Sequence, residues 1–131
     1  MLILTETMWE TDRILKVKSS AEWDKKDASL ITRCVLERIK DCLKITQKTD
    51  KKMTIIIDLS HGDFPPWLEA IKIAKFFVSM KSLLQESLDF TVIYAPTATQ
   101  QLWIGRILKL YTPARPVHMV KTVDELKNYI K

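Results

Sequence analysis

The chain has 131 residues, of which 47% are hydrophobic and 28% are charged, and its formal net charge is +5. This size and apolar content predict a single domain, residues 1–131, with a hydrophobic core of its own. Uninterrupted aliphatic runs such as Ile55-Ile56-Ile57 are far shorter than the roughly 20 apolar residues that a membrane-spanning helix needs. The first ten residues lack the basic region of a signal peptide, so we expect a cytoplasmic protein.

The first part of the chain predicts two strands followed by a helix. Residues 2–8 and 13–18 are typical of strands, and the polar residues between them fit the turn of a hairpin. Asp27 or Ser29 can cap a helix that runs to about Thr46. Its apolar positions recur at helical spacing, namely Ile31, Val35, Ile39 and Cys42.

The rest of the chain alternates strands with helices. Residues 53–59 form a β-branched run that suits a central strand covered on both faces. It is followed by a long apolar helix over 67–87 and a strand over 90–94. Next come a helix from Thr97 or Thr99 to Tyr111, a strand over 117–120 and a final helix with a Thr122–Glu125 capping box. Such alternation favours parallel βαβ units. We therefore expect an α/β fold with a mixed, mostly parallel sheet, an N-terminal hairpin and flanking helices.

The sequence offers little that predicts catalysis. Asp58, Ser60, His61 and Asp63 are close together, but neighbouring positions in the chain do not orient a serine and a histidine as nucleophile and base. The two glycines lie far apart, which excludes a phosphate-binding loop. Cys34 and Cys42 stand two helical turns apart, too far for a disulfide, and are expected to be buried thiols. We expect a protein that is not an enzyme and that holds no metal and no cofactor.

Two helices carry more apolar surface than one buried stripe requires. The helix over 67–87 includes Phe76, Phe77 and Met80, so it is either packed on two sides or presents an apolar face to a ligand or partner. In the next helix, Arg106 and Lys109 flank an apolar surface that includes Trp103. That helix either faces a lipid or a partner, or is a core helix with ordinary exposed charges.

The positive charge favours acidic partners in general. The lysines are spread along the chain, however, without an arginine-rich stripe or interleaved aromatic and basic residues. Nucleic acid is therefore disfavoured as a partner, and a solubilising surface is the simpler interpretation.

Several segments together resemble the CRAL-TRIO (Sec14-like) superfamily. They are Thr54-Ile55-Ile56-Ile57-Asp58-Leu59-Ser60, Val92-Ile93-Tyr94-Ala95-Pro96-Thr97, Leu102-Trp103 with Ile107-Leu108-Lys109, and Val117-His118-Met119-Val120 with Leu126 and Tyr129-Ile130. The C-terminal residues 120–130 look most like the divergent branch that includes BCH domains. The order of hairpin and βα units also resembles STAS domains, more weakly, because their phosphorylated Asp-Ser-Ser-Gly segment is replaced by Asp63-Phe64-Pro65-Pro66.

The first resemblance implies a Sec14-like domain that binds a lipid or another hydrophobic ligand, an anionic phospholipid included. Lys109 falls where phosphoinositide-binding members place a head-group lysine, and Arg106 lies beside it. We expect the ligand to contact Trp103, Phe76, Phe77 and Met80 as well. The alternative is a BCH-like or STAS-like protein-interaction module that self-associates, as a homodimer or larger homo-oligomer, or binds a regulatory partner. Peripheral contact with a membrane stays open in either case.

Overall fold

The computed structural model describes residues 2–5, 14–20, 28–49, 52–61 and 67–129. The described elements are β1 (Leu2–Thr5), β2 (Ile14–Ser20), α1 (Ala28–Gln47), β3 (Met53–His61), α2 (Trp67–Ser79), α3 (Lys81–Ser87), β4 (Leu88–Tyr94), α4 (Ala98–Leu110), β5 (Val117–Val120) and α5 (Val123–Lys127). Within these residues, no helix is both long and apolar enough to cross a bilayer.

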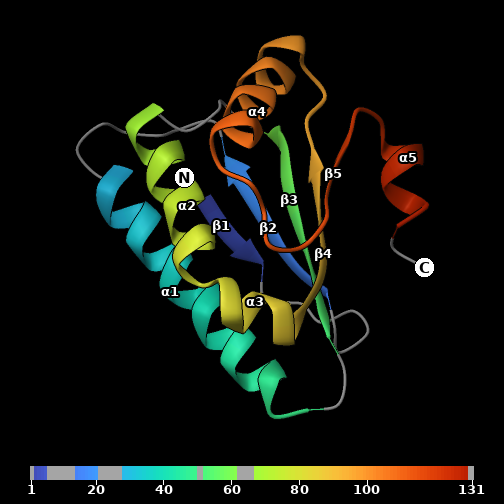
Figure 1. The fold of residues 1–131 in the computed structure, drawn as a ribbon. Coiled ribbons are helices and arrows are strands. Elements are labelled where there is room, and N and C mark those ends of the chain that lie inside the picture. The colour runs from blue at the N-terminus through green and yellow to red at the C-terminus, as the bar shows by residue number, and fades with distance from the viewer. Residues whose placement is uncertain (1, 6–13, 21–27, 50–51, 62–66, 130–131) are drawn as a thin grey trace.

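The five strands form one sheet in the order β1-β2-β3-β4-β5 (Figure 1). β1 pairs with β2 in antiparallel fashion, and each later strand is parallel to the strand before it. The predicted α/β fold, with its mixed and mostly parallel sheet and its N-terminal antiparallel pair, is therefore confirmed. The turn expected between the first two strands lies outside the described residues.

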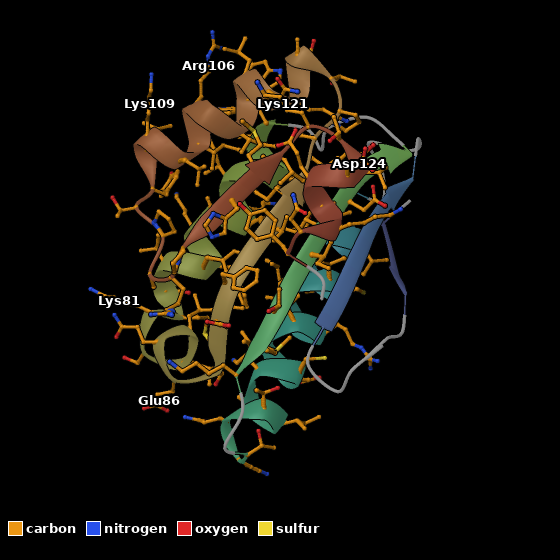
Figure 2. The ribbon with its side chains drawn as sticks, turned by 90° about the vertical axis from the view of Figure 1, so that its right-hand side faces the viewer. Lys81, Glu86, Arg106, Lys109, Lys121 and Asp124 are labelled. Atoms are coloured by element: carbon orange, nitrogen blue, oxygen red, sulfur yellow. The ribbon has the colours of Figure 1, made fainter. Side chains whose placement is uncertain are left out.

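Side-chain alternation along β3 shows which helices cover which face. Ile55 packs in a cluster with residues of α1, and Leu59 packs with Ile104 of α4. Ile56 lies between them in the chain and packs instead with Leu126 of α5. Because successive strand residues point to opposite faces, α1 and α4 cover one face of the sheet and α5 covers the other. Figure 2 looks onto the face that carries α5, with most of the other helices behind the sheet.

The long helix expected over 67–87 is wrong in one respect, because the chain turns at Met80 and forms two helices. Met80 has φ −99° and ψ 24°, outside the α region. The Ser79 hydroxyl donates to the carbonyl oxygen of Phe76 at 2.8 Å, a bond of the kind that competes with the helical ladder and bends helices. As a result α3 leaves the direction of α2 and leads directly into β4 (Figure 1).

Two further expectations need correction. Cys34 is exposed and only Cys42 is buried, because Cys34 lies about 100° around the helix from Val35, on the side away from the buried stripe. The strand expected over 53–59 is also longer than predicted, since β3 continues to His61, and Asp58 lies inside it and is only 5% exposed.

The helix caps agree well with the sequence pattern. Thr97, rather than Thr99, caps α4, and its hydroxyl accepts from the Gln100 amide at 3.2 Å while the Gln100 side chain accepts from the Thr97 amide. The Thr122 hydroxyl accepts from the Glu125 amide at 3.2 Å at the start of α5. α1 begins at Ala28, so Ser29 lies in its first turn rather than at its cap, and Asp27 lies outside the described residues.

Candidate functional site: an apolar cavity between two helices

A cavity of about 160 Å³ lies between α2, α4 and strands β3 to β5. Nearly all of its exposed wall is apolar. It is lined by Ile57, Leu59, Ala70, Ile73, Ala74, Phe77, Val78, Leu84, Leu88, Thr91, Ile93, Ile104, Ile107, Leu108, Tyr111, Thr112, Pro113, Ala114, Arg115 and Val117. These residues belong to the face of the sheet that α1 and α4 cover and to the segments packed on it, so the cavity is a gap in the hydrophobic layer between sheet and helices.

The space arises from small side chains on α2. Ala70 and Ala74 are buried in the wall, and a methyl group there reaches only a short way toward α4. Next to the cavity, Trp67 at the start of α2 packs on Trp103 of α4, with ring centroids 5.1 Å apart at 49°. The Trp103 ring also carries the Arg106 guanidinium, 5.1 Å from its centroid. The two indoles thus hold the helices together beside a stretch where the facing side chains do not fill the gap.

The cavity opens to solvent on one side. Val78 at the end of α2 is 47% exposed, and Thr112 and Pro113 of the connection from α4 to β5 are exposed, yet all three line it. Its mouth therefore lies between the end of α2 and residues 111–116.

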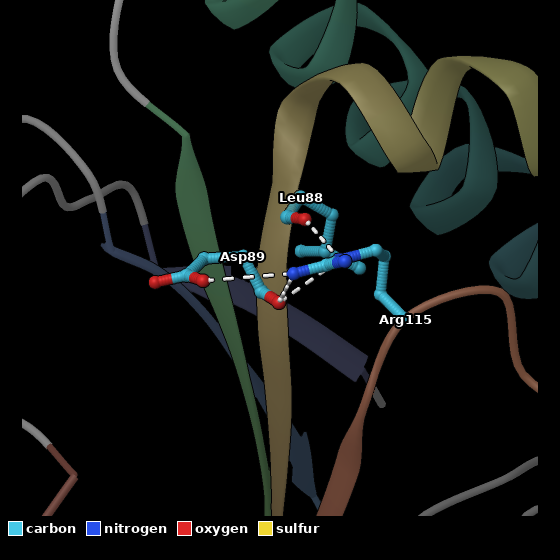
Figure 3. Close-up of polar contacts among 3 residues, drawn as sticks. All are labelled: Leu88, Asp89 and Arg115. Atoms are coloured by element: carbon cyan, nitrogen blue, oxygen red, sulfur yellow. Dashed lines mark hydrogen bonds and ion pairs between the residues drawn. The ribbon is translucent and has the colours of Figure 1, made fainter.

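Arg115 is the one charged residue among the described residues that line the cavity. Its guanidinium is directed to β4 (Figure 3): Nε donates to the carbonyl oxygens of Leu88 at 3.0 Å and Asp89 at 3.3 Å, and Nη2 donates to that of Asp89 at 3.2 Å. The Asp89 carboxylate lies 3.9 Å from Nη2. The guanidinium thus binds backbone carbonyl groups of β4, and the apolar stem of the side chain lines the cavity.

No protein-family model, no curated protein and no solved structure matches this chain significantly. Its function must therefore be inferred from its own residues and geometry.

The structure places the sequence-predicted aromatic and methionine residues in different surroundings. Phe77 lines the cavity. The Phe76 ring packs edge-to-face against the Phe77 ring, with centroids 5.4 Å apart, but Phe76 borders a separate groove between α1 and α2. Met80 lies at the turn between α2 and α3, against the core cluster under α1. Trp103 contacts Trp67 beside the cavity without lining it. Only Phe77 of these four belongs to the cavity wall.

The two predicted cations stand on the outer side of α4. Figure 2 shows Arg106 and Lys109 pointing away from the sheet, and both side chains are exposed. Arg106 is brought together with Trp103, whereas Lys109 has no ion-pair partner within the described residues. Neither cation lines the cavity.

Sequence reasoning missed Arg115 and the alanines of α2. The alanines give no signal of their own, because an alanine on an apolar helix stripe is ordinary core. Arg115 lies between Pro113 and Pro116 just before a strand. An arginine in so short a connection is well placed to bind carbonyl groups at a strand end, and this was the available signal.

The polar residues at the end of β3 and just after it do not provide a described catalytic arrangement. Asp58 is buried within the sheet, at the register position between Lys18 and Tyr94. The side chains of Ser60 and His61, and all of Asp63, lie outside what the structure describes. Among the described residues, no group of three or more histidine, cysteine, aspartate and glutamate side chains could hold a metal ion.

Proposed function

We propose that this protein is a non-enzymatic binding domain that holds a small apolar ligand, or the apolar end of a lipid, in the cavity between α2 and α4. The observation that carries the proposal is the nearly wholly apolar wall of a cavity that opens to solvent. Ligand sites are concave, mostly apolar and partly preformed, and this cavity has those features. The resemblance to the CRAL-TRIO superfamily supports the same class of ligand.

The size of the cavity limits the ligand. Its volume of about 160 Å³ is roughly half the lower end of the usual range for ligand pockets, about 300 Å³. It is close to the roughly 150 Å³ of an engineered apolar cavity that binds benzene. A single ring or a short acyl segment therefore fits, whereas the acyl chains of a whole phospholipid require the mouth to widen.

A polar head group would remain outside the mouth. Lys109 is the better placed of the two predicted cations, because it lies in the last turn of α4, two residues before the mouth residue Tyr111. Arg106 lies a turn earlier, over Trp103. An anionic head would gain from Lys109 through a solvent-screened attraction of modest size.

Binding to the cavity can be tested with fluorobenzene as a neutral probe, observed by ¹⁹F NMR. The purified protein should shift or broaden the probe signal. Ala74→Leu, which fills the cavity, should abolish the effect, whereas the exposed Ala98→Leu at the start of α4 should not. Equal binding to both variants would show that the probe binds elsewhere, and no binding to the unmodified protein would refute the proposal in its small-ligand form.

The lipid form of the proposal needs its own test. Native mass spectrometry should detect a co-purifying lipid, and the protein should sediment with vesicles that contain anionic phospholipid. Lys109→Ala combined with Arg106→Ala should weaken that sedimentation, while Lys48→Ala combined with Arg38→Ala, an equal loss of charge on and just after α1, should not. The head-group role falls if the two double variants behave alike.

A second candidate is a protein-interaction module. Exposed aliphatic residues on the two helices beside the cavity favour it: Leu68 on α2 is 72% exposed, and Leu102 and Leu110 on α4 are 54% and 63% exposed. Apolar surface of this kind, shared by neighbouring helices, is typical of association sites. Light scattering at increasing concentration separates the two candidates. A strict monomer that binds fluorobenzene would favour the ligand-binding function. A dimer that becomes monomeric in the double variant Leu68→Ser with Leu110→Ser would favour the interaction module.

A further inference from the structure

Residues 111–116, here called the strap, join α4 to β5 (Figure 1) and border the mouth of the cavity. Every strap residue from Tyr111 to Arg115 lines the cavity. Ala114 packs against the core cluster that includes Leu84 and Leu88. The outer part, Thr112 and Pro113, is exposed. The strap therefore covers part of the open side of the cavity, and a ligand that enters the cavity must displace it or pass beside it.

The strap is held firmly at its ends and weakly between them. The Tyr111 amide donates to the Ile107 carbonyl at 2.9 Å, and the Pro116 carbonyl accepts from the Thr91 amide at 3.0 Å. Within the described chain, residues 112–115 make no backbone-to-backbone hydrogen bond. Pro113 also has no amide hydrogen to donate. Segments with few backbone bonds open locally at low free energy.

Arg115 supplies the polar attachment that the strap backbone lacks. Three donor–acceptor contacts tie its guanidinium to the carbonyl oxygens of Leu88 and Asp89 (Figure 3). Leu88 is buried and begins β4, so these contacts join the strap to a fixed part of the sheet. Because hydrogen bonds from a charged donor are stronger than neutral ones, they are well suited to hold a segment closed.

From this arrangement we infer that Arg115 is a latch that sets the rate at which a ligand enters and leaves the cavity. The inference rests on the proposed function and names a positioning residue for it. Opening breaks the guanidinium contacts and exposes both partners to water, while the two ends of the strap stay attached. Since the guanidinium is directed at the backbone and the cavity wall is apolar, Arg115 gives a bound neutral ligand little affinity. Loss of the latch should therefore speed entry and exit together.

The test is the exchange of fluorobenzene measured by ¹⁹F NMR on the full chain, with Arg115→Met, Arg115→Lys and the matched surface variant Arg38→Met. Arg115→Met should raise the association and dissociation rates each by about tenfold, the size expected for loss of one charged hydrogen-bond set, and leave Kd within about threefold. Arg115→Lys keeps the charge but not the fork of donors, so its rates should fall between. Arg38→Met should exchange like the unmodified protein.

The outcomes separate the latch from the binding site. No fluorobenzene binding to the unmodified protein refutes the proposed function and the latch with it. Binding with unchanged exchange rates in Arg115→Met refutes the latch alone. The latch is also refuted if Arg115→Met raises the dissociation rate but not the association rate, so that affinity falls, because Arg115 would then shape the cavity. If Arg115→Met fails to fold, Arg115→Lys decides by the same criteria. Asp89→Asn, which keeps the backbone acceptors, should stay within about twofold of the unmodified rates.

Discussion

The face of the sheet that carries α1 and α4 is filled under α1, whereas under α4 it borders a cavity. Val35, Ile39 and Leu43 of α1 are at most 6% exposed and pack directly on Met53 and Ile55. Under α4 the buried cluster is small, with Leu59, Ala95 and Ile104, and about 160 Å³ beside it is empty.

The difference separates a stabilising part of the molecule from a part that can bind. A filled core gains both hydrophobic burial and dispersion contacts. A cavity lacks dispersion contacts along its wall, which lowers the free energy of unfolding. A protein tolerates this loss where the space has a use or where folding stability is already sufficient. The variants below either remove this contrast or make it sharper.

The largest effect should come from truncation in the filled part. Leu43 is fully buried, so Leu43→Ala should lower the free energy of unfolding by about 3–5 kcal/mol. Ile107 in the cavity wall is only partly buried and already borders empty space, so Ile107→Ala should cost about 1 kcal/mol. Urea unfolding measures both, with the exposed Leu110→Ala as control. Equal losses at Leu43 and Ile107 would contradict the contrast.

Added carbon atoms should act in opposite directions in the two parts. Cys42 is 4% exposed under α1, so Cys42→Leu should overpack that region and destabilise the protein by about 1–3 kcal/mol. Ala74→Leu should instead stabilise it by about 1 kcal/mol, because the new side chain enters the cavity. Thermal unfolding of both variants, with Ala98→Leu as control, measures the signs. A destabilised Ala74→Leu would mean that the cavity cannot accept the side chain.

A smaller gain should come from a polar group at the end of α3. The Ser87 hydroxyl is fully buried and has no hydrogen-bond partner within the described residues. Ser87→Ala removes an unsatisfied group and should stabilise the protein by about 1 kcal/mol. The exposed Ser82→Ala in the same helix reports the change in helix propensity alone. A loss of stability in Ser87→Ala would indicate that the hydroxyl has a partner after all, such as a buried water.

The smallest effect should appear as a pH dependence from the filled part. Burial raises the pKa of the Cys42 thiol, with Arg38 lowering it and Asp41 raising it to smaller extents. In the unfolded chain the thiol ionises first, so its contribution to stability is complete below about pH 8.5 and is lost as pH rises toward the higher folded pKa. Cys42→Ala should flatten the decline of stability above that pH, measured by urea unfolding at pH 7 to 10. An unchanged slope would contradict the assignment.

The sequence predicted the elements well where local signals were strong. Three features that depend on neighbours in the chain were found. They are the β-branched strand β3, which runs two residues past the predicted 53–59, the cap at Thr97, which was one of two candidates, and the Thr122 cap of α5. The break at Met80 was missed, because apolar periodicity continues through it and the bend depends on a side-chain bond from Ser79 to the backbone. The prediction that Cys34 is buried was wrong. Both cysteines fit the helix, but their exposure depends on which side of the helix faces the sheet.

The candidate site was predictable only in part. Phe77, one of the predicted ligand contacts, lines the cavity, while Phe76, one residue away, borders the groove between α1 and α2. The ligand contacts proposed for Lys109 and Arg106 stay predictions, because both lie outside the wall. Arg115 was not expected, since its contacts are with Leu88 and Asp89, far from it in the chain.

The sequence by itself determined the α/β alternation, the apolar strands, the helix caps and the lack of a membrane-length apolar run, because these depend on residue type and short spacing. Only the tertiary structure decided that Ala70 and Ala74 border an empty space and that Arg115 fastens the strap to β4. A cavity is a difference between the volume that the backbone encloses and the volume that the side chains fill. That difference exists only when segments distant in the chain are brought together.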